Sequence, residues 1–363
     1  MSVLRLPIEH VTPAGEIRTS RRGVLRGAAG FGIGLGAAGL FMDTSAHVQA
    51  QGTPEPGDPD YVGSDSTTKG STGDSTPVPG EIQPFTPFDA YLEPVIAGQK
   101  DVHITFQDKT VYIAKDEPYA GWTMNGTIPG TVIRAVEGDT IKVTVTNESP
   151  MVHSVDFHTS RVNPEQGYQG VQPGESFEWS YQAEYPGAFM YHCGTAPVLM
   201  HIGAGMYSAM IVDPKEGWAP AQELILIQSE FYVMPSKDDP AVMVPDAAKL
   251  FSGGTMDHVT FNGYANQYVE YPLKVKAGEL VCIFVVNCGP NVWSAFHVVG
   301  AIFDKAYVNA NPKNVLHGLQ TISIGPGDGA CVELTFDEPG TYIAVNHAFG
   351  HAAHGAIALI VAE

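Results

Sequence analysis

Thr140-Ile-Lys-Val-Thr-Val-Thr146 alternates polar and apolar side chains, with the period of two that is typical of a half-buried β-strand. Val102-His-Ile-Thr-Phe106 and Thr110-Val-Tyr-Ile113 repeat the pattern, and Gly, Pro and Asn turns separate such runs. The chain of 363 residues contains 40 Gly and 27 Pro, and only 16% of its residues are charged. This composition suits many short strands better than long charged helices, so the sequence predicts an all-β fold.

The two halves of the chain carry a weak internal repeat. In each half a Gly–acidic pair lies nine residues before an asparagine, and two Pro-Gly pairs then follow, thirteen residues apart. The repeated motifs are Gly138 to Asn147 with Pro173 and Pro186, and Gly278 to Asn287 with Pro326 and Pro339. The second Pro-Gly pair leads to a histidine in both halves, so His347 is expected at the position equivalent to His192. We predict two copies of one β-sandwich, over 85–215 and 216–363.

Residues 1–50 have the layout of a twin-arginine export signal. Ser20-Arg-Arg-Gly-Val-Leu-Arg26 precedes an uncharged run rich in Gly, Ala and Leu, Gly27–Met42, as such signals require. The run is too short and too rich in glycine for a membrane span, so we expect no stable span in the mature protein and a periplasmic or other extracytoplasmic location. An uncleaved N-terminal anchor is the alternative. Residues 51–84, rich in Gly, Ser, Thr, Pro and Asp, are expected to form a flexible linker.

Charge and cysteine placement exclude two further interpretations. The net charge of −20 would repel a phosphate backbone, so we expect no nucleic-acid partner. Cys193 stands beside a histidine, whereas Cys282, Cys288 and Cys331 lie in apolar, strand-like runs. We expect these three to be small buried side chains rather than members of disulfides.

The first half of the chain contains a set of copper ligands. Two imidazoles, a thiolate and a weak thioether form the set that holds a blue electron-transfer copper. The candidates are His153, Cys193, His201 and Met206. Met200 is an alternative thioether, but it adjoins His201 and would point elsewhere.

Strand geometry predicts a second metal site next to the first. Adjacent residues of a strand point to opposite faces, so His192 points away from the site that Cys193 would ligate. By the same parity Asp156 and His158 share a face. These three side chains are expected to converge, and the covalent His192–Cys193 link would give an electron a short path between the two sites.

A third histidine is needed to complete the second site, and His347 is the candidate. Three histidines leave one metal position open for water or substrate, which is typical of a reactive site. Zinc also fits three histidines, but a redox-inert metal would leave the neighbouring blue site without a purpose.

From about Ala90 to its C-terminus, the chain resembles the two-domain copper-containing nitrite reductases. The motifs that carry this resemblance are Met151-Val-His-Ser-Val-Asp-Phe-His158, Tyr191-His-Cys-Gly-Thr-Ala-Pro-Val-Leu-Met-His-Ile202 with Met206, Ser294-Ala-Phe-His-Val-Val-Gly-Ala-Ile-Phe-Asp304 and Val345-Asn-His347. The short loop from Cys193 to His201 is similar to that of the subgroup with the shorter type 1 ligand loop.

The resemblance implies two tandem cupredoxin-like Greek-key β-sandwich domains, a homotrimer, and one type 1 and one type 2 copper per chain. It implies that the type 1 ligands are His153, Cys193, His201 and Met206, and that the type 2 ligands are His158, His192 and, from a neighbouring subunit, His347. Asp156 and His297 match the catalytic pair of the family. Val299 falls in the substrate pocket, where the family usually has a larger isoleucine.

The implied activity is the dissimilatory reduction of nitrite to nitric oxide and water. This reaction needs one electron, expected to pass through Cys193 and His192 from type 1 to type 2 copper, and two protons, expected from Asp156 and His297. The opposing protonation needs of this pair predict a rate that falls at both pH extremes. The external electron donor is expected to be a small blue-copper protein or a cytochrome c.

Two alternatives remain open from the sequence. A two-domain laccase-like multicopper oxidase needs His-Cys-His and His-x-His motifs for a trinuclear cluster, but Gly194 follows Cys193 and no His-x-His occurs. A non-enzymatic electron-transfer or copper-storage protein would have no use for so many polar groups around a second site. His351 and His354 follow at helix-like spacing; the resemblance implies no role for them, and we expect surface or interface residues.

Overall fold

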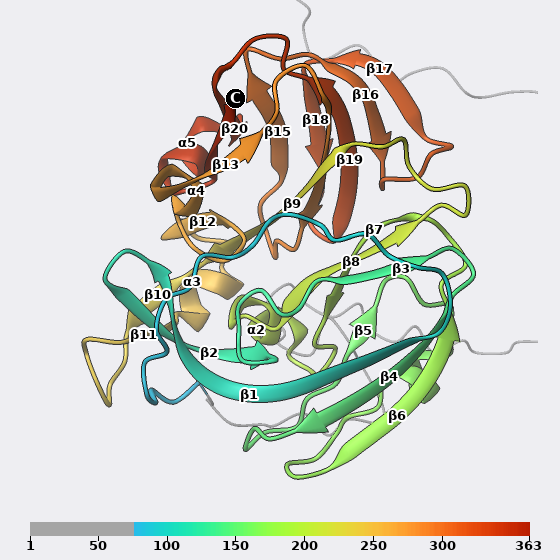
Figure 1. Ribbon diagram of the computed structural model, residues 1–363. Helices are drawn as coiled ribbons and strands as arrows, with labels where there is room; N and C mark the ends of the chain where they lie inside the picture. Colours follow the sequence, from blue (N-terminus) through green and yellow to red (C-terminus); the bar gives the residue numbers. More distant parts are fainter. Residues whose placement is uncertain (1–75) are drawn as a thin grey trace, which may run out of the picture. The chain divides into compact units, whose positions relative to one another are not determined.

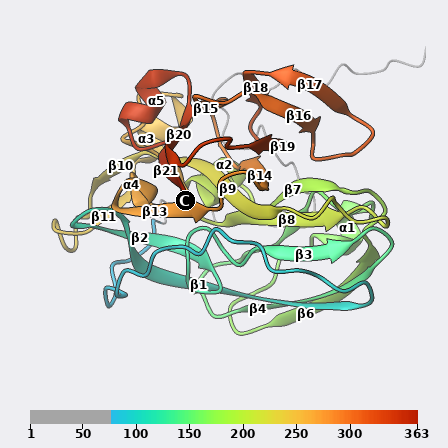
Figure 2. The same cartoon turned by 45° about the horizontal axis from the view of Figure 1, so that its top comes forward.

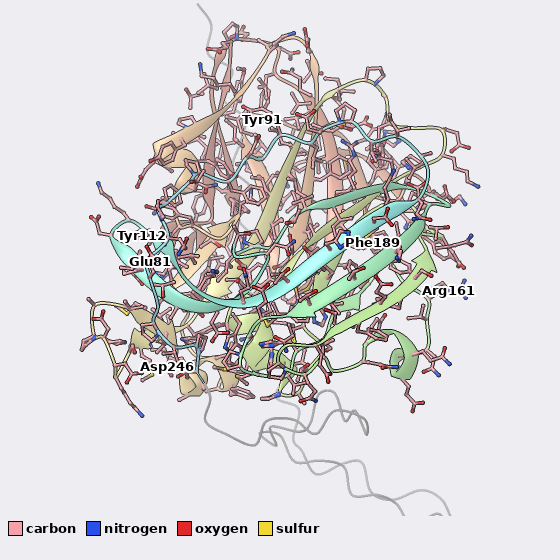
Figure 3. All side chains as sticks on the ribbon, turned by 60° about the horizontal axis from the view of Figure 1, so that its bottom comes forward. Glu81, Tyr91, Tyr112, Arg161, Phe189 and Asp246 are labelled. Atoms are coloured by element: carbon pink, nitrogen blue, oxygen red, sulfur yellow. The ribbon has the colours of Figure 1, made fainter. Side chains whose placement is uncertain are left out.

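The computed structural model describes residues 76–363, which belong to one compact unit. The predicted export signal over 1–50, and residues 51–75 of the predicted linker, lie outside the described residues. Residues 76–84 of the linker run beside β1 (Lys100–Ala114): the Gly80 and Gln83 amides donate to the side chain and carbonyl of Thr110 at 2.9 Å each. Glu81 and Tyr112, from these two segments, are labelled in Figure 3.

The first sandwich, drawn in cyan and green in Figure 1 except for the yellow to gold β10 and β11, consists of a six-stranded and a four-stranded sheet. In sheet order, the six strands are β10 (Val233–Pro235), β11 (Met243–Pro245), β2 (Glu117–Met124), β1, β4 (Thr140–Asn147) and β6 (Ser176–Gln182). The four strands are β3 (Ile133–Val136), β8 (Tyr207–Asp213), β7 (Gly187–His192) and β5 (Asp156–Phe157). Apolar side chains of both sheets form a shared core around Phe106, Phe157 and Tyr191.

The second sandwich, in yellow (β9) to orange and red in Figure 1, consists of a six-stranded and a five-stranded sheet. The six strands are β12 (His258–Phe261), β9 (Gln222–Phe231), β14 (Leu280–Asn287), β19 (Asp328–Thr335), β16 (Phe303–Val308) and β17 (Val315–Leu319). The five strands are β13 (Tyr271–Val275), β21 (Ile357–Ala362), β20 (Gly340–Asn346), β15 (Ser294–Val299) and β18 (Thr321–Ile324). The all-β prediction is therefore confirmed.

Short helices occur only in connections within residues 76–363. They are α1 (Pro164–Gly167), α2 (Val198–Gly203), α3 (Ala247–Phe251), α4 (Gln267–Glu270) and α5 (Phe349–Ala353). Among the described residues, no helix has the length and apolar character needed to cross a membrane.

The two sandwiches pack against each other through a separate apolar core. Ala188 and Met190 of β7 contact a cluster to which β8, β9 and β14 also contribute, and Figure 2 shows these strands between the green and red parts of the chain. Cys282, Cys288 and Cys331 lie in this core as free, buried cysteines, which confirms the expectation for them.

Two segments pack against a different sandwich from the one to which the predicted domain limits assign them. β10 and β11, beyond residue 216, extend the first sandwich through a parallel pairing of β11 with β2. Tyr91, before β1, bridges to Leu224 of the second sandwich, and its hydroxyl donates to the Lys274 carbonyl at 2.9 Å. Figure 3 labels Tyr91. The domain limits 85–215 and 216–363 stay a prediction.

The internal repeat is visible in backbone hydrogen bonds. The Gly174 amide donates to the Asn147 carbonyl at 2.8 Å, and the Gly327 amide donates to the Asn287 carbonyl at 2.7 Å. Both asparagine side chains are fully buried and use their amide nitrogens to bind loop carbonyls. The two halves therefore form the same turns with the same residue types.

Candidate metal centres

Three buried side chains of the first sandwich direct ligand atoms at one another. His153 precedes β5, Cys193 directly follows β7, and His201 lies on α2. The Nδ1 atoms of the two histidines are 3.1 Å apart, and the Cys193 Sγ lies 3.2 Å from the Nδ1 of His201 and 3.8 Å from that of His153. We call this group the thiolate cluster.

The loop after β7 folds back on itself and brings Met206 next to the thiolate cluster. The Met206 amide donates to the His201 carbonyl at 3.1 Å, and the Cys193 amide donates to the Met206 carbonyl at 3.0 Å. Met206 and Met200 are both buried in the apolar core that contains Cys193. Only Met206 has these backbone bonds to cluster residues on both sides of the loop.

Burial sets the protonation states of the thiolate cluster. It lowers the pKa of His201 to about 3 and that of His153 well below its ordinary value, with a further lowering from the neighbouring His201. Burial also raises the pKa of the Cys193 thiol, and hydrogen bonds from Ser154 and Thr195 partly oppose this. Both imidazoles are therefore neutral, and their Nδ1 atoms lie around a sulfur atom at distances that a cation could bridge.

The outer contacts of His153 were not foreseen from the sequence. Its Nε2 lies 3.1 Å from the Ser149 Oγ, and this hydroxyl donates to the Asp108 carboxylate at 2.7 Å. Because the hydroxyl has a single proton, it must accept the Nε2–H of His153, which leaves Nδ1 unprotonated and directed into the cluster. Trp122 covers the other side, with its ring centroid 4.7 Å from that of His201. No short sequence motif links Asp108 and Trp122 to His153.

A second group of side chains lies on the other side of the 192–193 peptide. The Nε2 atoms of His158 and His192 are 3.1 Å apart, and the Asp156 carboxylate lies 3.9 Å from the Nε2 of His192. Asp156 and His192 are register partners on β5 and β7, which fixes their separation. We call this group the histidine–aspartate cluster.

The histidine–aspartate cluster is open to solvent on one side only. His158 is exposed, whereas His192 is buried. Burial lowers the pKa of His192, the neighbouring His158 lowers it further, and Asp156 opposes both. The Nδ1–H of the neutral His192 ring donates to the Cys193 carbonyl at 2.8 Å, so the Nε2 lone pair is free to bind a ligand beside His158.

His297, Val299 and His347 lie together on the second sandwich. The rings of His297 and His347 have centroids 5.4 Å apart, and the His297 Nδ1 donates to the backbone carbonyl of Gln320. Val299 lies two residues beyond His297 on β15, and 43% of its surface is exposed. His347 is exposed as well, and among residues 76–363 it joins neither ligand cluster. Its assignment to a neighbouring subunit stays a prediction.

The expected equivalence of His347 and His192 is wrong. On the paired strands β7 and β8, His192 lies opposite Tyr207; on β20 and β21, Val345 lies opposite Ile357. Gly187 and Gly340 begin the two equivalent strands, so Val345 is the counterpart of His192, and His347 lies two residues further on. Val345 follows Pro339 by six residues, as His192 follows Pro186, whereas His347 follows Pro339 by eight, so the prediction matched residue type rather than spacing. Asp156 lies opposite His192, and His297 lies opposite Val345, so His297 is the counterpart of Asp156.

Comparisons with known proteins identify the family of the chain. A family model described as "Multicopper oxidase" matches residues 105–217. The copper-containing nitrite reductase of Neisseria meningitidis serogroup A is 37% identical over 270 residues, which cover 70% of this chain and 68% of the relative. The chain belongs to the copper-containing nitrite reductase family.

Solved structures of copper nitrite reductases share the fold. The enzyme of Nitrosomonas europaea is 36% identical, with a TM-score of 0.68, over 73% of this chain and 94% of that one. The enzyme of Thermus scotoductus SA-01 is 31% identical, with a TM-score of 0.67, over 74% and 62%. These likenesses confirm the cupredoxin-like fold and the family inferred from the sequence motifs, and they favour a nitrite reductase over a laccase-like oxidase.

The donors of the thiolate cluster fit copper. Imidazole nitrogen suits Cu(II), and thiolate and thioether sulfur suit Cu(I), so a mixed set accommodates both oxidation states. Membership of a copper enzyme family and this donor set together make copper the metal of the protein.

Proposed function

We propose that this protein reduces nitrite to nitric oxide and water, with consumption of one electron and two protons for each nitrite. The observation that carries this proposal is the division of two adjacent residues between two clusters: Cys193 belongs to one, and His192 to the other. A protein that needed only one metal would have no reason to build two ligand groups on either side of a single peptide bond.

The thiolate cluster is the proposed type 1 site, with His153, Cys193, His201 and Met206 as ligands. The histidine–aspartate cluster supplies His158 and His192 to the proposed type 2 site, and His347 of a neighbouring subunit completes it. Copper at these sites would supply one-electron redox chemistry and a positive charge that attracts nitrite. The peptide between Cys193 and His192 is then the shortest covalent path for the electron.

Asp156 and His297 are the proposed proton donors for the nitrite oxygen that leaves as water. The Asp156 carboxylate lies on the Nε2 side of the His192 ring, whereas the Cys193 carbonyl lies on its Nδ1 side, so this carboxylate is proposed to face the substrate. The bond from the His297 Nδ1 to the Gln320 carbonyl fixes the ring and keeps Nε2 available to bind and release a proton. Val299, on the same face of β15, is proposed to line the substrate pocket.

A homotrimer is proposed because the residues that the second sandwich would contribute to the type 2 site lie at the surface of the subunit. His347 is exposed, and it lies beside His297 rather than beside His158 of its own chain. A neighbouring subunit that packs against this face would bring the two half-sites together.

The remaining proposals concern cellular context. The twin-arginine pattern within residues 1–50 supports export to the periplasm or another extracytoplasmic compartment, where folded proteins that already hold a cofactor can be delivered. A small blue-copper protein or a cytochrome c is the proposed electron donor.

The decisive experiment combines metal analysis with turnover. We expect two coppers per chain with distinct absorption and paramagnetic-resonance signatures, and nitric oxide from nitrite and a reductant. One copper per chain, or none of this product, would contradict the proposal. Oxygen consumption with a phenolic substrate would instead favour a laccase-like enzyme.

A change of His347 to alanine tests the type 2 site independently of the type 1 site. We expect nitrite turnover to fall by at least about 100-fold, because a ligand of the reactive site is lost, while the blue absorbance of the thiolate cluster persists. Phe349→Ala is the matched control, since its ring packs on His347 at 4.7 Å without offering a ligand atom. Full activity in His347→Ala would refute the type 2 assignment.

A further inference from the structure

The second sandwich contains a counterpart of the thiolate cluster. In the first sandwich, amides donate from Cys193 to Met206 and from Met206 to His201; in the second, the same bonds run from Asn346 to Ala356 at 3.1 Å and from Ala356 to His351 at 3.2 Å. Gly205 and Gly355 adopt almost the same conformation in the two loops, with φ of 120° and 118°. Asn346 therefore takes the place of Cys193, and His351 that of His201.

This counterpart lacks three of the four ligand side chains of the first sandwich and retains only the histidine, His351. Asn346 replaces the thiol, Ala356 replaces the thioether of Met206, and Ser294 replaces His153 in the register of β15. One contact of the original arrangement remains in another form: the Asn346 Nδ2 lies 2.9 Å from the His351 Nδ1, where Cys193 and His201 are 3.2 Å apart. An amide–imidazole hydrogen bond stands where the first sandwich has a sulfur–imidazole pair.

Asn346 uses its side chain to join two segments. Its Oδ1 accepts from the amides of Ala295 and Ala348 at 3.1 Å each, and its Nδ2 donates to the Trp293 carbonyl at 2.9 Å. Asn346 is fully buried, so each of these bonds forms in the absence of competing water. The start of β15 and the turn after β20 are thereby fixed to each other.

His351 completes the pattern as a neutral acceptor. Because Nδ2 can only donate, a hydrogen bond between this pair places a lone pair on the His351 Nδ1 and the proton on Nε2. Gln228 offers a further acceptor at 3.1 Å from the same Nδ2. The Nδ2 of Asn346 therefore faces three acceptors, while its Oδ1 faces two backbone N–H donors, and these neighbours determine the orientation of the amide.

The segments that Asn346 joins carry the two histidines of the second half-site. His347 lies between Asn346 and Ala348, and its amide donates to the Ala295 carbonyl at 2.7 Å. His297 lies two residues after Ala295 on β15. We infer that Asn346 and His351 act as positioning residues that hold the rings of His347 and His297 at their 5.4 Å separation. This inference deepens the proposed function and rests on the role given there to His347.

The test compares copper binding at the two sites in the intact, exported protein. Asn346→Asp keeps the acceptor oxygen and removes the donors, His351→Ala removes one acceptor, and His351→Gln restores an acceptor at that place. His354→Ala is the matched control, since His354 is on the same turn but donates to the Asp257 carbonyl at 2.8 Å and is not bonded to Asn346. Chelator competition measures copper affinity at each site, and the blue absorbance reports that the chain is folded.

We expect type 2 copper to bind about 10–100-fold more weakly in Asn346→Asp and about tenfold more weakly in His351→Ala, the range typical when an outer partner of a ligand is lost. His351→Gln should recover most of this loss, and type 1 affinity should stay within twofold in every variant. Unchanged type 2 affinity in folded Asn346→Asp, or an equal loss in His354→Ala, would overturn the inference. A wild-type protein with no type 2 copper would instead overturn the proposed function.

Discussion

At the scale of single residues, the orientation of His153 depends on Ser149, four residues before it, and on Asp108, which lies on another strand. Ser149 and Asp108 form a chain of hydrogen bonds in which each hydrogen has one acceptor, and this chain assigns the His153 proton to Nε2. Outer partners of this kind fix the tautomer of a ligating histidine and increase its basicity. Ser149 is itself buried, so water cannot easily replace its hydroxyl.

Removal of this hydroxyl should weaken copper binding. We expect Ser149→Ala to reduce the Cu(II) affinity of the thiolate cluster by about tenfold and to shift its blue absorption band, because His153 loses its acceptor. Thr144→Val is the control, since it removes an exposed hydroxyl that bonds a carboxylate, that of Glu178, on the same sheet. Equal effects of the two changes on affinity and spectrum would rule out this role for Ser149.

At the scale of elements, the thiolate cluster depends on one tight turn between α2 and β8. Gly205 has a φ of 120°, and a Cβ there would lie 3.0 Å from the Trp122 carbonyl oxygen and closer still to Ile128. Only glycine accepts both the conformation and the contact. The turn also sets the direction in which Met206 leaves the helix.

A methyl group at this turn should damage the protein strongly. We expect Gly205→Ala to lower the free energy of unfolding by about 3 kcal/mol, from backbone strain and crowding together, and to bleach the blue colour. Gly217→Ala is the control, with a φ of 73° and open space around it, and should cost only about 1 kcal/mol. Denaturant titration of both variants measures the difference; comparable losses would show that crowding is unimportant.

The sequence predicted the strands, and which candidate side chains lie together, better than it predicted the correspondence between the two halves of the chain. Alternation such as that of Thr140–Thr146 identified strands because one sheet face is buried, and His153, Cys193 and His201 could be grouped because few residue types bind copper. The position of His347 was assigned wrongly because a histidine follows each Pro-Gly pair, although the distance from Pro339 already places Val345 at the position of His192. Asp108 was missed because a partner from another strand leaves no short-range signal.

At the scale of the whole molecule, one buried carboxylate makes stability depend on pH. Glu230, at the end of β9, accepts from the backbone amides of Asn291 and Val292, whereas its Oε2 has no partner within residues 76–363. Burial raises its pKa to about 7, although those amides oppose the shift. The free energy of unfolding therefore falls as the pH rises from about 4.5, the pKa of the glutamate in the unfolded chain, to about 7, its pKa in the folded protein.

Replacement of this carboxylate should stabilise the protein in alkali. Each unit of raised pKa corresponds to about 1.4 kcal/mol once both states are ionised, so Glu230→Gln should gain about 3 kcal/mol over the wild type at pH 8 and little at pH 4. Glu333→Gln is the contrasting variant, because Glu333 is also buried but pairs with Lys305 at 2.8 Å, and its loss should destabilise. Melting temperatures of both variants and the wild type across this pH range measure the effect. The same difference between Glu230→Gln and the wild type at every pH would contradict the raised pKa of Glu230.

The histidines of the two clusters differ in their exposure to solvent, and this difference has a chemical consequence. Of the four histidines in the clusters, His158 alone is exposed, while His192, His153 and His201 are closed off by the sandwich around them. A reagent that acylates imidazoles in the metal-free subunit would therefore modify His158 quickly and the other three only as fast as the surrounding β-structure opens. The speed of the slower labelling would then measure how often the interior beneath the copper ligands becomes accessible, without any need for the enzyme to turn over.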